Sequence, residues 1–560
     1  MIFLTRLRKM ELALSILTLV YADLHFNGVE MLNAAIKRIL RVLLFLLGCL
    51  VVPVTRLRAF FDHRRRCPPI RNKILLMTAT ELAEKIRKGE ITSEQVVSSY
   101  IERCREVNPV INAIVEDRFE AALREARQVD SFVKSGGKSE EALARDTPLL
   151  GIPVTVKESI AVTGMSHCVG RKREVSRKAI EDAEVVAKVR QAGCIVLLVS
   201  NTPEMCMCWE SYNNVTGTTR NPYDSRRTAG GSSGGEAALL GAGASLLSLS
   251  SDIGGSARLP AMFCGVFGHK PTPEWVSTTG HMPGCTDKNW SSFFSIGPMV
   301  RYAQDLPILL KTIGQSDAPI SRLGEVVPMS EVRFFYMEDD GGSGATSPVD
   351  REIKDSIRKV IAHLETYHAA KVQRADIKEL RYAFEIGASM LLRLDGADSI
   401  FKKGTDPCEW KSVFVECLRY ICLVSPHTFP NIVYGVLKRI SDKLPVSHYD
   451  RMVEKNNLLK TRFQDILGDN GVLIYPSFIG PAHYPYEIFH KVCNVSYMMI
   501  FNALGLPVTQ CPVGLNRNGL PIGVQIVGNP GSDHLTIAVA QEIERAFGGW
   551  HQPPSHEKII

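Results

Sequence analysis

The chain of 560 residues is 45% hydrophobic and 22% charged, values typical of a globular protein with material for a large core, in one domain or up to about three. Its net charge of +7 is concentrated in residues 1–75, where 13 Lys or Arg and 4 Asp or Glu give +9, so residues 76–560 sum to −2. Because nucleic-acid binding usually needs a basic face on the folded domain, this distribution argues against a nucleic-acid partner.

The basic arm over residues 1–75 contains a candidate membrane anchor at about residues 39–54. Residues 42–54 carry no charge and have basic residues on both sides. Such a run spans a hydrocarbon core of about 30 Å only if the flanking Lys and Arg side chains extend to the interface. The C-terminal flank is the more basic one, which favours a cytosolic position for the rest of the chain.

Two alternatives for this arm stay open. Residues 12–21 are apolar and follow three basic residues, as in a signal peptide, and residues 42–54 could instead form a helix buried against the domain. With the anchor interpretation, we expect a protein associated with an internal membrane, single-pass or monotopic, and the side of the membrane on which the main domain lies stays open.

Residues 76–560 alternate predicted helices and strands without a visible linker. Helices are expected over 78–108 as a pair, 120–133, 182–192 and 350–367, and strands over 152–156 and 194–199. Thr92 and Gln95 form the capping box that starts the second helix of the pair. We therefore expect a single α/β domain over 76–560, with a mixed, twisted central sheet covered by helices on both faces.

Two glycine-rich segments, G-G-S-S-G-G at 230–235 and S-D-I-G-G-S at 251–256, enclose a helix of small residues over 237–249. Dense glycine lets several backbone N–H groups point into one space, as the oxyanion of an acyl-transfer reaction requires. The first segment also matches the G-x-S-x-G nucleophile elbow of α/β-hydrolases, but polar residues precede it where that motif needs a buried strand. That rival interpretation also needs a histidine, and His269 is a weak candidate because a lone histidine is more often structural.

Lys157 ends the apolar strand over 152–156, and two interpretations of it stay open. An apolar surround would desolvate the amine and lower its pKa, which would make it a base, whereas a strand-end lysine more commonly reaches solvent. The 14 cysteines contain no C-x-x-C pair, and no H-E-x-x-H segment occurs. The sequence therefore predicts no metal centre and no cofactor.

These segments, in this order, resemble the amidase-signature family, together with G-H-K-P-T at 268–272 and G-L-P-I-G-V-Q at 519–525. The resemblance implies a serine hydrolase that cleaves carboxylic amides through an acyl-enzyme. Ser256 would be the nucleophile, Ser232, on a cis peptide bond, the proton relay, and Lys157 the base. It also implies an oxyanion hole made by the backbone N–H groups of Ile253, Gly254, Gly255 and Ser256, with Ser233, Asp252 and Arg258 as supporting residues. Ala257 departs from lipid-amide relatives, which often have Ile there.

Within the family the chain is most similar to the fatty-acid amide hydrolases, especially their second, N-terminally anchored vertebrate form, through Y-M-E-D-D-G-G at 336–342 and A-F-G-G-W at 546–550. This likeness implies long-chain fatty-acid amides as substrates, a membrane as partner, and a membrane cap at about residues 409–440, which are apolar with cationic edges. A homodimer is an open alternative to a monomer. The other functions left open are a small-amide amidase, a component of amidotransferase type, and a non-catalytic scaffold on the same fold.

Overall fold

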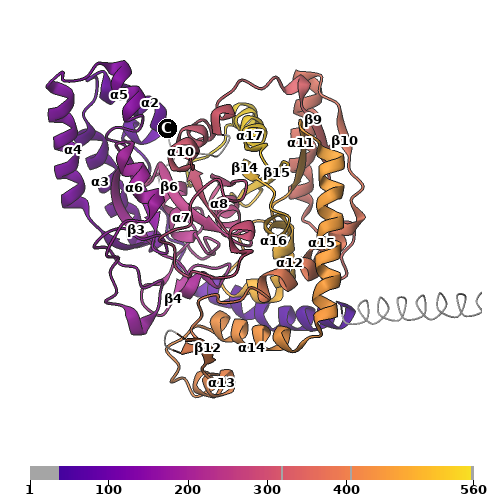
Figure 1. Ribbon diagram of the computed structural model, residues 1–560. Coiled ribbons are helices and arrows are strands. Elements are labelled where there is room, and N and C mark those ends of the chain that lie inside the picture. Colours follow the sequence, from indigo (N-terminus) through magenta and orange to yellow (C-terminus); the bar gives the residue numbers. More distant parts are fainter. Residues whose placement is uncertain (1–36, 317–319, 404–405, 556–560) are drawn as a thin grey trace, which may run out of the picture.

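The computed structural model describes residues 37–316, 320–403 and 406–555. Within these residues, 11 strands form one mixed sheet in the order β1-β3-β2-β6-β8-β7-β14-β15-β13-β9-β10 (Figure 1). In that order the strands are Ile114–Asp117, Ile195–Ser200, Pro153–Lys157, Leu247–Asp252, Ser295–Val300, Phe267–Lys270, Val508–Leu515, Pro521–Val527, Gly471–Pro476, Arg333–Tyr336 and Val372–Arg374. Two short hairpins, β4–β5 (Tyr212–Asn213, Gly217–Thr218) and β11–β12 (Lys402–Lys403, Asp406–Trp410), lie outside this sheet.

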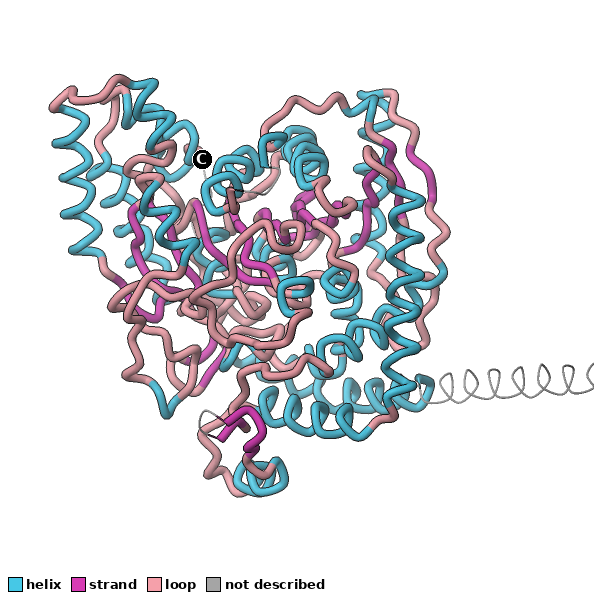
Figure 2. Tube along the Cα trace, viewed as in Figure 1, coloured by secondary structure: helices cyan, strands magenta, loops and turns pink. Residues whose placement is uncertain are grey.

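Helices surround the sheet on both faces (Figure 2). They are α2 Ala79–Arg87, α3 Ser93–Ile111, α4 Phe119–Lys134, α5 Glu140–Asp146, α6 Glu184–Gln191, α7 Gly234–Gly241, α8 Arg258–Cys264, α9 Trp290–Phe293, α10 Leu306–Ile313, α11 Arg351–His368, α12 Ala383–Leu392, α13 Val413–Ile421, α14 Phe429–Lys443, α15 Val446–Leu467, α16 Ser496–Ala503 and α17 Asp533–Phe547. The expected α/β domain with a mixed, helix-covered sheet is confirmed. The capping box of Thr92 and Gln95 starts α3, as its spacing predicts.

The strands at the centre of one half of the sheet are buried along their whole length. β2 pairs with β3 and with β6, both in parallel, and every residue of the three strands is buried. A parallel strand covered by helices on both faces has no solvated side, which explains the nearly continuous apolar sequence of β3. This packing places the carboxyl ends of β2 and β6, and with them Lys157 and Ser251, side by side in the interior.

A helix over Lys37–Phe61 precedes the sheet and is long and apolar enough to cross a membrane. Its 25 residues span about 37 Å at about 1.5 Å per residue, against a hydrocarbon core of about 30 Å. The helix runs across the lower part of the molecule in Figure 1, above α14 in this view, and contacts the rest of the domain, where Lys37 forms an ion pair with Glu385 and Thr55 Oγ1 lies 3.3 Å from Glu487 Oε1. Its other side leaves a row of large apolar side chains exposed: Leu43, Phe45, Leu46, Leu50, Val54, Leu57, Phe60 and Phe61.

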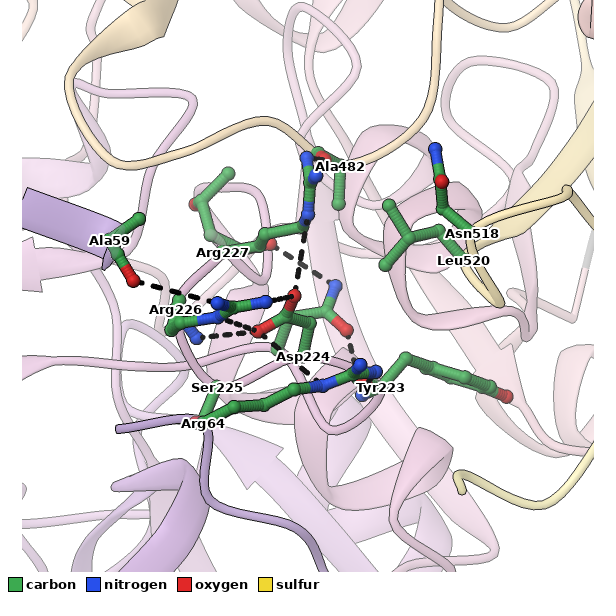
Figure 3. Close-up of polar contacts among 12 residues, drawn as sticks. Ala59, Arg64, Tyr223, Asp224, Ser225, Arg226, Arg227, Ala482, Asn518 and Leu520 are labelled. Carbon is green, nitrogen blue, oxygen red and sulfur yellow. Dashed lines mark hydrogen bonds and ion pairs between the residues drawn. The ribbon is translucent and has the colours of Figure 1, made fainter. Parts of the chain in front are cut away.

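The chain that follows this helix is attached to the domain through Asp224 (Figure 3). Arg226 holds both oxygens of the Asp224 carboxylate at 2.9 Å, and Arg64 and Arg227 approach it at 3.8 and 3.7 Å. Arg64 also donates to the carbonyl oxygen of Tyr223 at 2.8 Å. Several arginines on one largely buried carboxylate, with a backbone hydrogen bond, fix the end of the basic arm to the loop that leads to residues 230–235.

Helices α13 and α14 lie at the bottom of the molecule in Figure 1, in the region of residues 409–440. α13 leaves most of its apolar side chains in solvent, and so does the turn after it: Phe414, Val415, Leu418, Ile421, Leu423 and Val424 are all exposed. A row of this kind on a water-facing surface usually marks a protein or membrane contact. The pair is joined to the domain by Glu204, which accepts hydrogen bonds from Thr428 and pairs with His427.

Candidate active site

Lys157 ends β2 in the interior and does not reach solvent. Its Nζ lies 2.7 Å from Ser232 Oγ and 2.9 Å from Ser251 Oγ. Burial lowers the pKa of the Lys157 ammonium, although the neighbouring Cys206 and Asp252 act in the opposite direction. A lysine in this setting has a larger neutral fraction near neutral pH than a solvated one, which is the property a general base needs. Of the two interpretations of Lys157, the structure therefore favours the desolvated amine.

Ser232 lies in the first glycine-rich segment, just before α7. The Gly231–Ser232 peptide bond is cis, as the family resemblance implies. The backbone of Gly231 passes so close to the chain at Cys208 and Glu210 that a Cβ atom would lie 2.7 Å from a carbonyl oxygen and an amide nitrogen there. The Ser232 carbonyl accepts hydrogen bonds from Thr202 Oγ1 at 3.0 Å and Ser211 Oγ at 3.3 Å. These contacts hold the Ser232 hydroxyl against Lys157.

Ser256 follows the tight loop that connects β6 to α8. The loop is organised by Asp252, which accepts the N–H of Gly255 at 2.8 Å and that of Ala257 at 3.1 Å. Gly255 has a φ of +100°, and a Cβ there would collide with Met498. The Ser256 carbonyl accepts the Ser233 N–H at 3.1 Å, which links the two glycine-rich segments directly.

Arg258 is the fully buried partner of Asp252. Its Nε and Nη2 atoms contact the two carboxylate oxygens at 3.0 Å each, and Nη2 also donates to Asn502 Oδ1 at 2.7 Å. Burial by itself would raise the pKa of Asp252, but Arg258 holds it well below its usual range. This bidentate pair thus keeps a charged carboxylate in the interior, where it fixes the backbone on both sides of Ser256.

The structure brings Lys157 and Ser232 into direct contact and places Ser256 in the adjoining segment. Among the described residues no hydrogen bond joins Ser232 Oγ to Ser256 Oγ. The N–H of Gly255 already donates to Asp252, whereas no acceptor is present in the described structure for the N–H groups of Ile253, Gly254 and Ser256. The Gly254 carbonyl is held by Trp209 Nε1 at 2.9 Å.

Sequence reasoning missed two residues that contact this lysine system. Ser251 Oγ lies between Lys157 Nζ and His281 Nε2, at 2.9 and 3.1 Å. His281 Nδ1 lies 3.0 Å from the Pro283 carbonyl oxygen, which can only accept, so this nitrogen carries the proton and Nε2 is the acceptor. Burial and the nearby Lys157 hold the pKa of His281 well below its ordinary value, so the ring is neutral. Ser251 therefore donates to His281 and accepts from Lys157.

His269, the candidate base in the nucleophile-elbow interpretation, forms hydrogen bonds with residues outside the glycine-rich segments. His269 Nδ1 lies 2.9 Å from Thr509 Oγ1, and its Nε2 lies 3.1 Å from Asp533 Oδ1. Both ring nitrogens are thus used within the core, while the Ser232 hydroxyl is bonded by Lys157. The interpretation of residues 230–234 as a nucleophile elbow with a histidine base is not supported.

Comparison with known proteins identifies the family. A family profile described as Amidase matches residues 95–537. The chain belongs to the amidase family. This amidase is 40% identical over 536 residues to fatty-acid amide hydrolase 2-B of Danio rerio, covering 92% of this chain and 98% of the relative. It is 39% identical over 493 residues to fatty-acid amide hydrolase 2 of Homo sapiens, covering 87% and 92%.

Solved structures of other amidases share the fold. A fatty acid amide hydrolase superposes with a TM-score of 0.70 at 22% identity, covering 85% and 86% of the two chains. A bacterial aryl acylamidase superposes with a TM-score of 0.68 at 20% identity, covering 85% and 97%. The protein is an amide-hydrolysing enzyme similar to fatty-acid amide hydrolase 2, and this excludes the non-catalytic scaffold.

Proposed function

We propose that this amidase hydrolyses long-chain fatty-acid amides through an acyl-enzyme on Ser256, with Ser232 as proton relay and Lys157 as base. The observation that carries the chemistry is the contact of 2.7 Å between Ser232 Oγ and the buried Lys157 Nζ, beside the segment that holds Ser256. The support for the substrate class is the similarity to proteins named fatty-acid amide hydrolase 2 over most of both chains.

In the proposed reaction, Ser256 Oγ attacks the amide carbonyl while its proton moves to Ser232 Oγ and the Ser232 proton moves to neutral Lys157. The negative charge on the former carbonyl oxygen is stabilised by the backbone N–H groups of the 253–256 loop. When the C–N bond breaks, the proton returns along the same relay to the leaving amine. Water then attacks the ester carbonyl of the acyl-enzyme and releases the fatty acid, with the same residues acting as base and then as acid.

A fluorophosphonate probe tests this chemistry, because it labels only an activated serine. We expect Ser256→Ala to abolish both labelling and amide hydrolysis. Lys157→Ala should lower both by about 10²–10⁴-fold, the usual loss for a positioned base, while the protein stays folded. Ser250→Ala, which removes a buried hydroxyl that contacts Gly297 instead of Lys157, is the matched control. Near-normal turnover of Lys157→Ala would overturn the relay.

We also propose that the enzyme sits on a membrane through the Lys37–Phe61 helix and the α13–α14 cap. The helix contacts the catalytic domain along one side and exposes apolar residues on the other, which favours a monotopic position in the interface over a protruding anchor. The exposed residues of α13 would enter the same interface. A long acyl chain prefers the bilayer by about 0.8 kcal/mol per buried CH₂, so an enzyme that acts on it gains by collecting its substrate there. A homodimer stays a prediction.

The dependence of activity on the acyl length of the substrate distinguishes long-chain fatty-acid amides from the alternative substrate classes. We expect kcat/KM to rise with acyl length in a series of amides with one common leaving amine. A preference for short amides would leave the amidase chemistry intact and favour a small-amide amidase, and activity with glutamine would favour the amidotransferase-type alternative.

A further inference from the structure

We propose that His363, His368 and Glu542 form a binding site for Zn²⁺ that bridges α11 and α17. His363 lies in the last two turns of α11, His368 is the last residue of that helix, and Glu542 lies on α17. The ligand atoms of the three residues, two imidazole nitrogens and one carboxylate oxygen, all lie within 4.8 Å of one another. α11 and α17 are in the upper half of the molecule in Figure 1, and α13 and α14 are at the bottom.

Both imidazoles point their Nε2 atoms at the same carboxylate oxygen. His363 Nε2 lies 2.7 Å and His368 Nε2 2.6 Å from Glu542 Oε1. A hydrogen on either Nε2 atom lets that ring donate to the carboxylate oxygen. When the rings carry their hydrogens on Nδ1 instead, the same three atoms offer three lone pairs to one metal ion. Two imidazoles and a carboxylate are a ligand set that Zn²⁺ takes up in proteins.

The geometry needs only a small adjustment to accept the ion. Zn–N and Zn–O bonds of about 2.0–2.1 Å at a tetrahedral angle put ligand atoms about 3.3 Å apart. The two N···O distances would therefore open by about 0.7 Å from their values of 2.7 and 2.6 Å. His368 can supply this shift because it ends its helix, and the helix C-terminus also favours a cation there.

The surroundings hold the ligands in place. Arg545 Nη2 donates to the other oxygen of Glu542 at 2.5 Å, which turns Oε1 toward the histidines. The His363 ring packs on Tyr367 and Phe547, with ring centroids 4.9 and 5.7 Å away. Such outer contacts orient metal ligands and reduce the cost of binding. The Glu542 side chain is only 7% exposed, while those of His363 and His368 are 17% and 28% exposed, so an ion can enter from solvent and keep a water as fourth ligand.

The test uses the full chain, stripped of metal with a chelator and titrated with Zn²⁺ against a chromophoric competitor. We expect one Zn²⁺ per chain with micromolar or tighter affinity, and a higher Tm when the metal is added, because the ion binds the folded protein. Co²⁺ in the same site should show the visible absorption of a four-coordinate ion with nitrogen and oxygen ligands. His368→Asn should weaken Zn²⁺ binding by at least about tenfold, since even changes at outer contacts of metal sites cost that much.

His448→Asn is the matched control, because it removes an imidazole that lies on α15 and is not one of the three ligands. It should bind Zn²⁺ like the original chain. His368→Asn should keep the hydrolytic activity and the metal-free Tm of the original chain, which shows that the variant is folded. A chain that binds no Zn²⁺, or a His368→Asn variant that binds it unchanged, for example through cysteines, would overturn the site. Neither result depends on which amide the enzyme cleaves.

Discussion

Replacing Ser251 by Ala should shift the pH dependence of catalysis toward acid. Ser251 gives its proton to His281 and can only accept from Lys157, so its oxygen stabilises the lysine ammonium more than the neutral amine. A hydrogen bond to a charged group contributes about 1.5–3 kcal/mol and one to a neutral group about 0.5–1.5 kcal/mol. The difference of about 1–2 kcal/mol corresponds to about one pH unit at 1.36 kcal/mol per unit.

The sign follows from the form of Lys157 that acts as base. The reaction needs the neutral amine, so activity rises with pH through the pKa of Lys157, which burial has already lowered. Loss of the Ser251 oxygen removes an acceptor for the charged form and lowers this pKa further. The acid limb of kcat/KM should therefore move down by about one pH unit.

The assay is the pH profile of kcat/KM for a long-chain amide. Ser251→Thr, which keeps the hydroxyl, should retain the original acid limb, and Ser250→Ala, on the same strand, should do so as well. Other titratable groups near the lysine are Cys206, Asp252, Glu236 and His281; burial raises the pKa of Glu236 to about 7 and holds that of His281 well below its ordinary value. If Ser251→Ala leaves the acid limb where it is, a group other than Lys157, such as Glu236, controls it, and the reasoning is refuted.

Two further predictions concern stability and the membrane. Arg258→Ala should lower the free energy of unfolding by about 3–5 kcal/mol, because it leaves the buried Asp252 carboxylate without its ion pair; an unchanged urea midpoint would contradict this. A chain that begins at Asp62 lacks the Lys37–Phe61 helix but keeps Arg64 on Asp224, and should be folded, active and still partly bound to liposomes. Replacing Phe414 and Ile421 by Gln in that shorter chain should abolish its remaining binding to liposomes. Liposome binding that persists in this variant would exclude α13 as a membrane contact.

Local patterns in the sequence predicted much of the catalytic region. The apolar run before Lys157 predicts a buried strand, because only a strand covered on both faces lacks alternating polar residues. The glycines at 231 and 255 mark places where the backbone passes too close to its neighbours for a side chain, so their clustering indicates a loop of unusual shape. The cap of α3 follows from the spacing of two residues on one turn. In each case the pattern lies within a short segment and can be read from the sequence, although Glu210 and Met498, which Gly231 and Gly255 approach, come from elsewhere in the chain.

The partners of these residues were decided only by the tertiary structure. Whether Lys157 contacts solvent or Ser232, 75 positions later, depends on how β2, β6 and α7 pack. The hydrogen-bond roles of Ser251 and His281 depend on the Pro283 carbonyl oxygen, and no sequence motif indicates that contact. His363 and His368 are separated from Glu542 by 179 and 174 positions, and their spacing of five matches no helical ligand motif. The apolar helix over Lys37–Phe61 lies along the domain, whereas its composition fits a protruding anchor equally well. Contacts between residues distant in the chain leave no periodic signal, because each partner is compatible with many environments until the fold brings one of them within bonding distance.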